Sequence, residues 1–314
     1  MNKTNIIIAG IGGVGGYFGG LLAKHFHDHE HVEINFFARG KHLAEIQKHG
    51  LQVTKGNSTF IAKPTIATDH PSELGIADFI IISTKSYDIE AVIQQLQPCI
   101  NQDTIILPLL NGVDSRERIK HVLTDNIVLE GCVYIVSRLK QAGVIENSGI
   151  IETLYFGLDN YVNEKLLLFE KLFREAKVEA TYSTSISTII WEKFIFISPV
   201  ATATSYFDKC IGALLAHKEK RMMVIALLEE VIQVAKAKNV LISEDILEKT
   251  LNKWNALPFE TTSSMHADFK NKKPNNELLS LTGYVIKEGR KYNIETPTYL
   301  MAYAELEKKS VQLS

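Results

Sequence analysis

Residues 5–25 are NIIIAGIGGVGGYFGGLLAKH, with seven glycines in the eleven positions from 10 to 20. The apolar run at residues 5–9 predicts a buried strand, and residues 17–26 predict the helix that follows it. Between them, GIGGVG at residues 10–15 fits the GxGxxG pattern, which after a strand and before a helix is typical of a dinucleotide-binding fold. A glycine-rich turn that binds nothing is the alternative.

The glycines of this loop have separate expected roles. Gly10 allows the tight turn, Gly12 lets a pyrophosphate touch the main chain, and Gly15 lets the helix pack closely on the strand. The phosphates are expected at the helix N-terminus, where free N–H groups and the helix dipole favour anions. The expected cofactor-binding residues of the loop are Gly10, Ile11, Gly12, Gly13, Val14 and Gly15.

The end of the second strand indicates which dinucleotide is bound. Residues 32–38 predict that strand, and an NAD site usually ends it with an acidic residue that holds the ribose 2′-hydroxyl. Here Arg39 follows, and a guanidinium suits a 2′-phosphate through paired, charge-assisted hydrogen bonds. We therefore expect NADP(H), with an exposed turn arginine as the alternative.

Strands and helices continue to alternate, which predicts a parallel, doubly wound sheet. Residues 79–83 and 104–109 are further apolar runs of strand length. Lys85 and Asn111 come just after these runs, where strand ends line the ligand crevice, so both are candidate cofactor contacts and Asn111 is also a candidate substrate contact. Either side chain could instead cap the next helix.

The second half of the chain has a different pattern. Residues 130–160 contain two or three more strand-like pieces, expected to complete the sheet. Helices are predicted at residues 186–204, 218–238, 243–255 and 278–292. We expect a dinucleotide-binding domain over residues 1–180 and a helical substrate and dimerisation domain over residues 181–314.

Composition excludes several classes of protein. The 314 residues are 46% hydrophobic, enough for two globular domains, and the net charge of -2 without a long basic stretch argues against nucleic acid or an anionic membrane as partners. The three cysteines form no CxxC pair, which fits a reducing compartment, and the cytoplasm is expected. No export signal is expected, nor an apolar stretch near the roughly 18 residues of a membrane span.

The whole chain resembles the ketopantoate reductase (2-dehydropantoate 2-reductase) family. The resemblance lies in the order and spacing of GIGGVG (10–15), ARG (38–40), STKSYD (83–88), LLNGVD (109–114), WEKF (191–194), SSMHADF (263–269) and GYVIKEGRKYNIETP (283–297). It implies a Rossmann-type domain followed by an all-helical one, NADPH as the cofactor, and reduction of a 2-oxo acid to a 2-hydroxy acid in pantothenate biosynthesis.

The same resemblance implies roles for particular residues. Lys193 matches the family's general acid, which protonates the ketone oxygen as hydride reaches the carbon. Ser264 matches the substrate-binding serine, and Lys85 and Asn111 match cofactor and substrate contacts of the first domain. The family uses no metal and none is expected here, although His25, His27, His29 and His31 alternate in HFHDHEH. The apolar repeat at residues 222–235 fits helix core or the surface of a homodimer.

Some positions depart from the family pattern. Counted without gaps from Lys193, the family's asparagines fall on Ile197, Ala201 and Ile211, and its glutamate falls on Asn276, with Glu277 one residue late. Either Asn276 and the hydroxyls of Ser198, Thr202 and Thr204 supply substitute donors, or the substrate is a more apolar 2-oxo acid than ketopantoate. A non-catalytic NADP(H)-binding protein is the remaining alternative.

Overall fold

The computed structural model describes residues 3–311 and divides into two compact units. One contains the chain up to Leu110 together with Ser115–Ile186, and the other contains Asn111–Asp114 together with the chain from Ser187. The division after Ile186 lies beyond the last strand, whereas residue 180 falls inside that strand.

The first unit is built on a six-stranded parallel sheet in the order β5-β2-β1-β6-β7-β8. In chain order these are strands 3-2-1-4-5-6, which is the doubly wound Rossmann arrangement. The strand order reverses between β1 and β6, where a ligand crevice is expected. The strands are β1 (Thr4–Ala9), β2 (Val32–Phe37), β5 (Ile66–Thr68), β6 (Phe79–Ile82), β7 (Ile105–Pro108) and β8 (Ile127–Val128).

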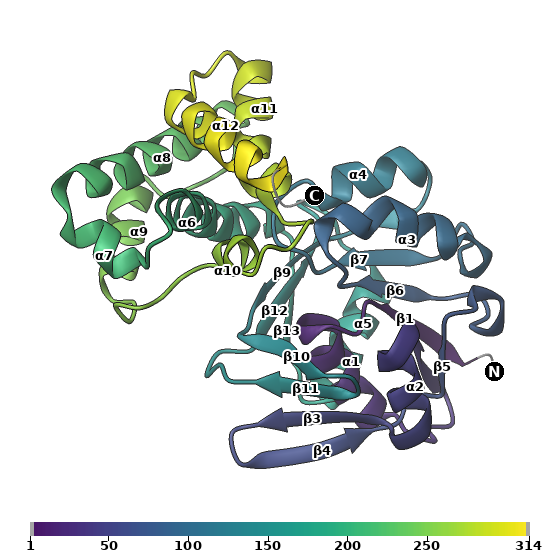
Figure 1. Ribbon diagram of the computed structural model, residues 1–314. Coiled ribbons are helices and arrows are strands. Elements are labelled where there is room, and N and C mark those ends of the chain that lie inside the picture. Colours follow the sequence, from purple (N-terminus) through teal and green to yellow (C-terminus); the bar gives the residue numbers. More distant parts are fainter. Residues whose placement is uncertain (1–2, 312–314) are drawn as a thin grey trace. The chain divides into compact units, whose positions relative to one another are not determined.

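Helices cover both faces of this sheet because alternate strand residues point to opposite sides (Figure 1). Ile6 and Ile8 pack with one face's cluster, which includes residues of α1, α2 and α5, whereas Ile7 packs with residues of α3 and α4. The helices are α1 (Gly13–His25), α2 (Gly40–His49), α3 (Ile89–Gln95), α4 (Ser115–Val122) and α5 (Glu164–Glu175), with short helices η1 (Pro71–Glu73), η2 (Ser86–Asp88) and η3 (Gln97–Cys99).

The prediction that residues 130–160 complete this sheet is wrong, because they enter two other sheets. One has the order β10-β11-β3-β4 and the other β13-β12-β9. Short connections suit antiparallel pairing, and β10 pairs antiparallel with β11 as β12 does with β9. The parallel partners of β11 and β12 are β3 and β13, which are reached through longer connections. They are β3 (Leu51–Lys55), β4 (Ser58–Ala62), β9 (Glu130–Tyr134), β10 (Ser137–Gln141), β11 (Val144–Asn147), β12 (Thr153–Gly157) and β13 (Glu179–Ser183).

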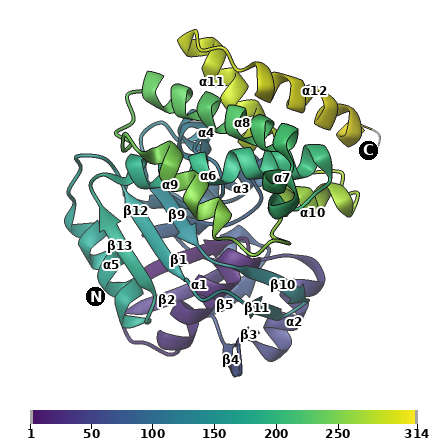
Figure 2. The same cartoon turned by 90° about the vertical axis from the view of Figure 1, so that its left-hand side faces the viewer.

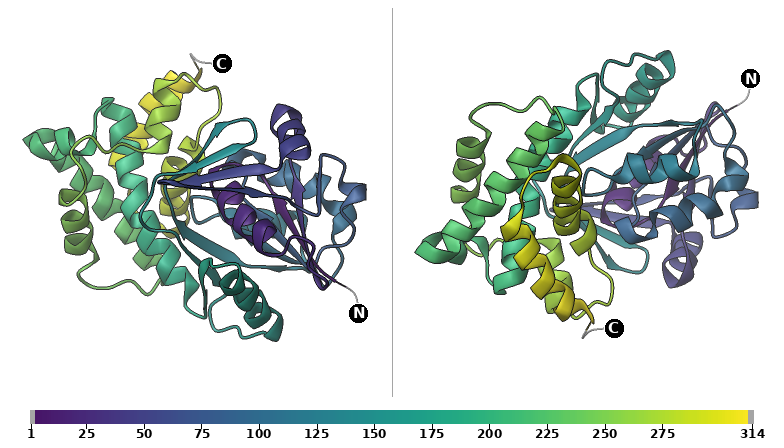
Figure 3. Two further views of the ribbon diagram at one scale, coloured as in Figure 1. Left: turned by 90° about the horizontal axis from the view of Figure 1, so that it is seen from below. Right: turned by 90° about the horizontal axis from the view of Figure 1, so that it is seen from above.

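The second unit is helical, as expected. Within it, α8, α11 and α12 lie side by side (Figure 3). Its helices are α6 (Ile186–Phe207), α7 (Ile211–Ala216), α8 (Lys218–Ala237), α9 (Ile246–Asn255), α10 (Ser264–Lys270), the π-helical η4 (Leu279–Gly283), α11 (Tyr284–Tyr292) and α12 (Pro297–Val311).

Helix α6 corrects the expectation that no apolar stretch approaches the length of a membrane span. It has 22 residues and a window of mean hydropathy 1.3, and 61% of that window is buried inside the structure. Length and composition of this kind are also those of a core helix, and Phe194 and Ile195 of α6 pack in the hydrophobic core of the helical unit.

Candidate functional site

The glycine loop after β1 is closely packed on its protein side. Gly10 has φ of +90°, and a Cβ there would lie 2.7 Å from the backbone nitrogen of Thr84. A Cβ on Gly15 would lie 2.2 Å from the carbonyl oxygen of Gly10. These two positions therefore exclude side chains because the loop, α1 and the end of β6 press together.

The side of the loop at Gly12 is open. Gly12 is the N-cap of α1, no side chain caps this helix, and a Cβ on Gly12 would meet no atom within 4 Å. The side chain of Ile11 is buried and Val14 packs against the core, so the loop offers its backbone rather than its side chains. An uncapped helix N-terminus beside open space fits the phosphates of a dinucleotide.

Two buried hydroxyls lie next to this loop. Ser83 Oγ and Thr84 Oγ1 make no hydrogen bond with any residue that the structure describes. Both follow β6, on the other side of the point where strand order reverses, and the Cβ of Ser83 would lie 2.9 Å from a Cβ on Gly15. Of this segment only Lys85 was predicted as a site residue, because no sequence pattern marks a hydroxyl that will be buried without a partner. The two hydroxyls further support a dinucleotide site.

Arg39 follows β2 and is the N-cap of α2, with a side chain that is 74% exposed. Its guanidinium lies 3.8 Å from the carboxylate of Asp88 in η2. Asp88 belongs to the STKSYD segment but was not predicted as a site residue. A carboxylate beside Arg39 lowers the net positive charge available to a 2′-phosphate.

Lys85 and Asn111 do not cap the helices that follow them. Lys85 is the N-cap residue of η2 but makes no side-chain cap hydrogen bond, and α4 begins only at Ser115. Asn111 instead accepts a hydrogen bond from Lys193, whose Nζ lies 3.0 Å from Asn111 Oδ1. The predicted general acid therefore meets a predicted site residue that is 82 positions away in the chain.

The loop that carries Asn111 belongs to the helical unit. Val113 packs against the hydrophobic core of that unit, and a Cβ on Gly112, where φ is +101°, would lie 3.6 Å from the carbonyl oxygen of Ser280. Asn111 and Lys193 thus form a site within one unit. Their hydrogen bond is charge-assisted, and it orients the ammonium group.

The hydroxyls of α6 are not substitute donors for a substrate, contrary to the first of the two expectations. Ser198 Oγ donates to the carbonyl oxygen of Leu281 at 2.9 Å, and Thr202 Oγ1 lies 2.8 Å from Thr282 Oγ1. Thr204 Oγ1 donates to the carbonyl oxygen of Val200 at 2.6 Å. All three hydroxyl side chains are fully buried and already bonded inside the helical unit.

The three apolar residues at the family's asparagine positions lie in different surroundings. Ile197 is half-buried one turn after Lys193, whereas Ala201 is 1% exposed in the core. Ile211 does not lie further along the same helix, because α6 ends at Phe207 and Ile211 begins α7. Counting turns from Lys193 fails there since the helix does not continue.

Asn276 and Glu277 also take different roles. Asn276 Oδ1 accepts a hydrogen bond from the backbone N–H of Leu278 at 3.0 Å, and its Nδ2 donates to Ser310 Oγ at 3.2 Å. The adjacent Glu277 is 3% exposed. The amide of Asn276 is therefore engaged at the start of a helical segment, and the carboxylate of Glu277 is buried beside it.

Ser264 is the exposed first residue of α10. The preceding Ser263 is the N-cap, and its Oγ accepts from the backbone N–H of His266 at 3.0 Å. Among the described residues, neither Ser264 nor Asn276 is hydrogen-bonded to Lys193. The structure thus joins Lys193 with Asn111 but leaves the predicted substrate role of Ser264 a prediction.

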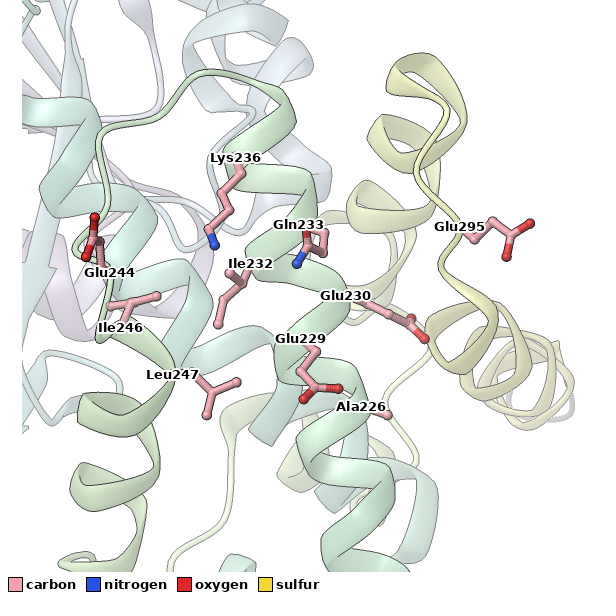
Figure 4. Close-up of a pocket in the computed structure, with 10 residues that line it drawn as sticks. All are labelled: Ala226, Glu229, Glu230, Ile232, Gln233, Lys236, Glu244, Ile246, Leu247 and Glu295. Atoms are coloured by element: carbon pink, nitrogen blue, oxygen red, sulfur yellow. The ribbon is translucent and has the colours of Figure 1, made fainter.

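A pocket of about 500 Å³ lies in the helical unit between α8, α9 and the segment before α12, with neither Lys193 nor Asn111 among its lining residues. Figure 4 shows that its acidic side chains diverge: Glu230 and Glu295 lie on one side of α8, whereas Glu244 lies across from Lys236 on the other. Glu230 is also engaged, since its oxygens accept the N–H groups of Thr298 and Tyr299. Among residues 3–311, no three His, Cys, Asp or Glu side chains are placed to hold a metal ion.

Comparison with known proteins agrees with this arrangement. Residues 6–160 match the family described as ketopantoate reductase PanE/ApbA, and residues 185–310 match the description ketopantoate reductase PanE/ApbA C terminal. The chain belongs to the ketopantoate reductase family. The two matches cover both units, and the family is one of oxidoreductases.

This chain is similar to a protein of known structure, the 2-dehydropantoate 2-reductase of Porphyromonas gingivalis W83. It is 36% identical with a TM-score of 0.84, covering 97% of this chain and 99% of that chain. A Bacillus subtilis (strain 168) relative described as uncharacterized oxidoreductase YkpB is 29% identical over 304 residues, 96% of this chain and 97% of its own.

Two structures of lower sequence identity share the fold of this chain. One is a D-mandelate dehydrogenase with NADH and anilino(oxo)acetate, 22% identical with a TM-score of 0.82 over 99% of each chain. The other is a dimeric ketopantoate reductase from Staphylococcus aureus, 20% identical with a TM-score of 0.78 over 99% of this chain and 100% of that one.

Proposed function

We propose that this protein reduces a 2-oxo acid to the corresponding 2-hydroxy acid with NADPH, and that 2-dehydropantoate is the first substrate to test. The observation that carries the proposal is the 3.0 Å hydrogen bond between Lys193 Nζ and Asn111 Oδ1, which pairs the expected proton donor with an orienting amide. When bound, NADPH supplies the hydride.

Lys193 has the chemistry that the ketone oxygen requires. An oxygen that becomes an alkoxide needs a proton donor and a nearby positive charge, and an ammonium group provides both. Asn111 accepts one of the three ammonium hydrogens, so it restricts the group's rotation. The proton passes from Lys193 Nζ to the carbonyl oxygen.

The first unit is proposed to hold the cofactor. The open backbone at Gly12 and the uncapped start of α1 suit the pyrophosphate, and the exposed guanidinium of Arg39 suits a 2′-phosphate. Asp88 tempers this preference, and the mandelate dehydrogenase with a similar fold has NADH bound. Lys85 completes the expected set of cofactor contacts.

On the substrate side, Ser264 and Asn111 remain the proposed polar contacts. Glu277, rather than Asn276, is proposed for the role of the family's glutamate, because the Asn276 amide is hydrogen-bonded to Leu278 and Ser310. The half-buried Ile197 favours an alkyl or aryl side chain on the substrate. The similarity to a D-mandelate dehydrogenase supports this more apolar 2-oxo acid as the second candidate.

The setting of the reaction is also proposed. A role in pantothenate biosynthesis follows if 2-dehydropantoate is the substrate. The three free cysteines fit the cytoplasm, and the similarity to a dimeric ketopantoate reductase supports a homodimer.

The test is a steady-state assay of the purified protein with NADPH and with NADH, using 2-dehydropantoate, branched-chain 2-oxo acids and phenylglyoxylate. Fast oxidation of NADPH with one of these substrates is expected. Preference for phenylglyoxylate or a branched-chain acid would select the apolar alternative. Tight NADPH binding without turnover of any 2-oxo acid would contradict the proposal and leave a non-catalytic binding protein.

A further inference from the structure

The imidazole of His42 is hydrogen-bonded to two backbone groups, one in the glycine loop and one in the turn of a neighbouring hairpin. His42 lies half-buried in the first turn of α2. Its Nε2 is 2.7 Å from the carbonyl oxygen of Ile11, and its Nδ1 is 2.8 Å from the backbone nitrogen of Gly143. One side chain thus connects the glycine loop to the turn between β10 and β11.

These partners determine the protonation state of the ring. The backbone N–H of Gly143 can only donate, so Nδ1 must accept and carries no hydrogen. The carbonyl of Ile11 can only accept, so Nε2 must carry the hydrogen and donate. Only the neutral imidazole with its hydrogen on Nε2 makes both bonds.

The bond to Ile11 sets the direction of the next amide. A trans peptide points its C=O and N–H in opposite directions, and the described chain has no cis peptide. Holding the Ile11 oxygen toward α2 therefore turns the N–H of Gly12 away from α2, beside the open space at this residue. A glycine-rich loop loses much conformational entropy when it binds a ligand. A hydrogen bond that already fixes part of the loop lowers this entropic cost of binding.

We propose that His42 is a positioning residue for the dinucleotide phosphates, acting through the carbonyl of Ile11 to pre-orient the amide of Gly12. The inference rests on the proposed dinucleotide site but goes beyond it, because it assigns a role to a side chain that need not touch the cofactor.

The β10–β11 hairpin gives this tether a rigid support (Figure 2). The carbonyl of Gly143 accepts the N–H of Gln52 at 2.9 Å, so the turn is anchored to β3 as well as to His42. At its other end the hairpin packs against α1, since a Cβ on Gly13 would lie 2.2 Å from the carbonyl oxygen of Ser137. The hairpin and His42 therefore hold the loop from two directions.

Acidification should break only one of the two bonds. Burial lowers the pKa of His42 below its ordinary value of 6.5, so the ring is neutral near pH 7. Below that lowered pKa, Nδ1 gains a proton and can no longer accept from Gly143, whereas Nε2 still donates to the carbonyl of Ile11. The loop at residues 10–15 and the turn at residues 141–143 carry no ionisable side chain. The titratable and charged groups of the packed elements are Lys41, Glu45, Lys48 and His49 on α2, Lys24 and His25 on α1, Lys55 on β3, and Arg138, Lys140 and Glu146 on the hairpin.

Two amide substitutions separate the two bonds. In His42→Gln, Nε2 can replace the donor to Ile11, whereas in His42→Asn, Oδ1 can replace the acceptor for Gly143. His42→Leu removes both. His49→Gln, on the exposed last turn of the same helix, is the matched control.

The experiment measures the dissociation constant of NADP⁺ for the full-length protein and each variant by calorimetric titration, with folding checked by circular dichroism. We expect His42→Leu and His42→Asn to bind at least about 5-fold more weakly, and His42→Gln and His49→Gln to stay within about 2-fold of the natural protein. Between about pH 8 and pH 5, the affinities of the natural protein and of His42→Gln should change in parallel, within about 2-fold, because protonation of His42 and its replacement by glutamine both keep the donor to Ile11.

Equal affinities for all variants, or retained affinity in His42→Asn with loss in His42→Gln, would overturn the inference. If the leucine variant does not fold, the comparison of Gln with Asn decides, and if the amide variants do not fold, affinity retained within about 2-fold in His42→Leu overturns the inference. Absence of NADP⁺ and NAD⁺ binding to the natural protein would instead refute the proposed function.

Discussion

The pairing of Lys193 with Asn111 predicts a specific kinetic coupling between the two residues. A hydrogen bond to a charged group is worth about 1.5–3 kcal/mol, and the observed Nζ–Oδ1 distance of 3.0 Å is that of a well-formed bond. Converted to a rate, Asn111→Ala should lower kcat/KM by roughly 10- to 150-fold, since the ammonium loses its orientation. Lys193→Met should lower it by about 10²–10⁴-fold, the usual contribution of a general acid.

The double variant distinguishes two roles for Asn111. If the amide acts through Lys193, Asn111→Ala should cost little in a protein that already carries Lys193→Met. The assay is the steady-state oxidation of NADPH with the 2-oxo acid that the natural protein reduces fastest. Lys253→Met, on the exposed face of α9, controls for the loss of a lysine.

A particular result would refute this reasoning. If Asn111→Ala is as costly in the Lys193→Met background as in the natural protein, Asn111 acts directly on substrate or cofactor and the observed bond is incidental to catalysis. Melting temperatures of the four proteins must agree closely, because Asn111 also lies in a loop that packs against the helical core.

Four further substitutions have expected outcomes. Arg39→Ala should remove most of the preference for NADPH over NADH. Asp88→Asn should tighten NADPH binding by about 2- to 5-fold, because a negative charge beside Arg39 is lost. Fluorescence titration with both cofactors measures these affinities, and unchanged affinities in both variants would contradict the two expectations. Ile197→Asn should raise kcat/KM for 2-dehydropantoate relative to branched-chain 2-oxo acids, measured by steady-state kinetics, and a fall in that ratio would argue against an apolar substrate pocket. Arg118 donates two 2.6 Å hydrogen bonds to Glu90 and lowers the pKa of that carboxyl. The pair therefore stabilises the fold above about pH 4.3, and the stabilisation is lost as pH falls through the lowered pKa. Arg118→Gln should lower the free energy of unfolding by under about 1 kcal/mol at neutral pH and by less in acid, measured by urea unfolding at several pH values.

The sequence by itself was sufficient for the local elements around the dinucleotide site. The apolar run before Gly10 and the glycines after it predicted β1, the turn and α1, because strand length, helix periodicity and glycine's conformational freedom are properties of neighbouring residues. Helices α6, α8, α9 and α11 of the second unit were predicted for the same reason, whereas α7, α10 and α12 were not. Family resemblance supplied Lys193, which no local pattern distinguishes from a solvated helix lysine.

Tertiary structure decided what pairs with what. The strands at residues 130–160 were recognised, but their sheet was not, because pairing depends on connection length and on the partner edges that remain free. Likewise Asn111 follows a strand of the first unit yet bonds Lys193 of the second, and the hydroxyls of Ser198 and Thr202 on α6 bond partners in η4 rather than a substrate. His42 carries no sequence signal at all, since its two partners are backbone groups 31 and 101 residues away that only folding brings to one ring.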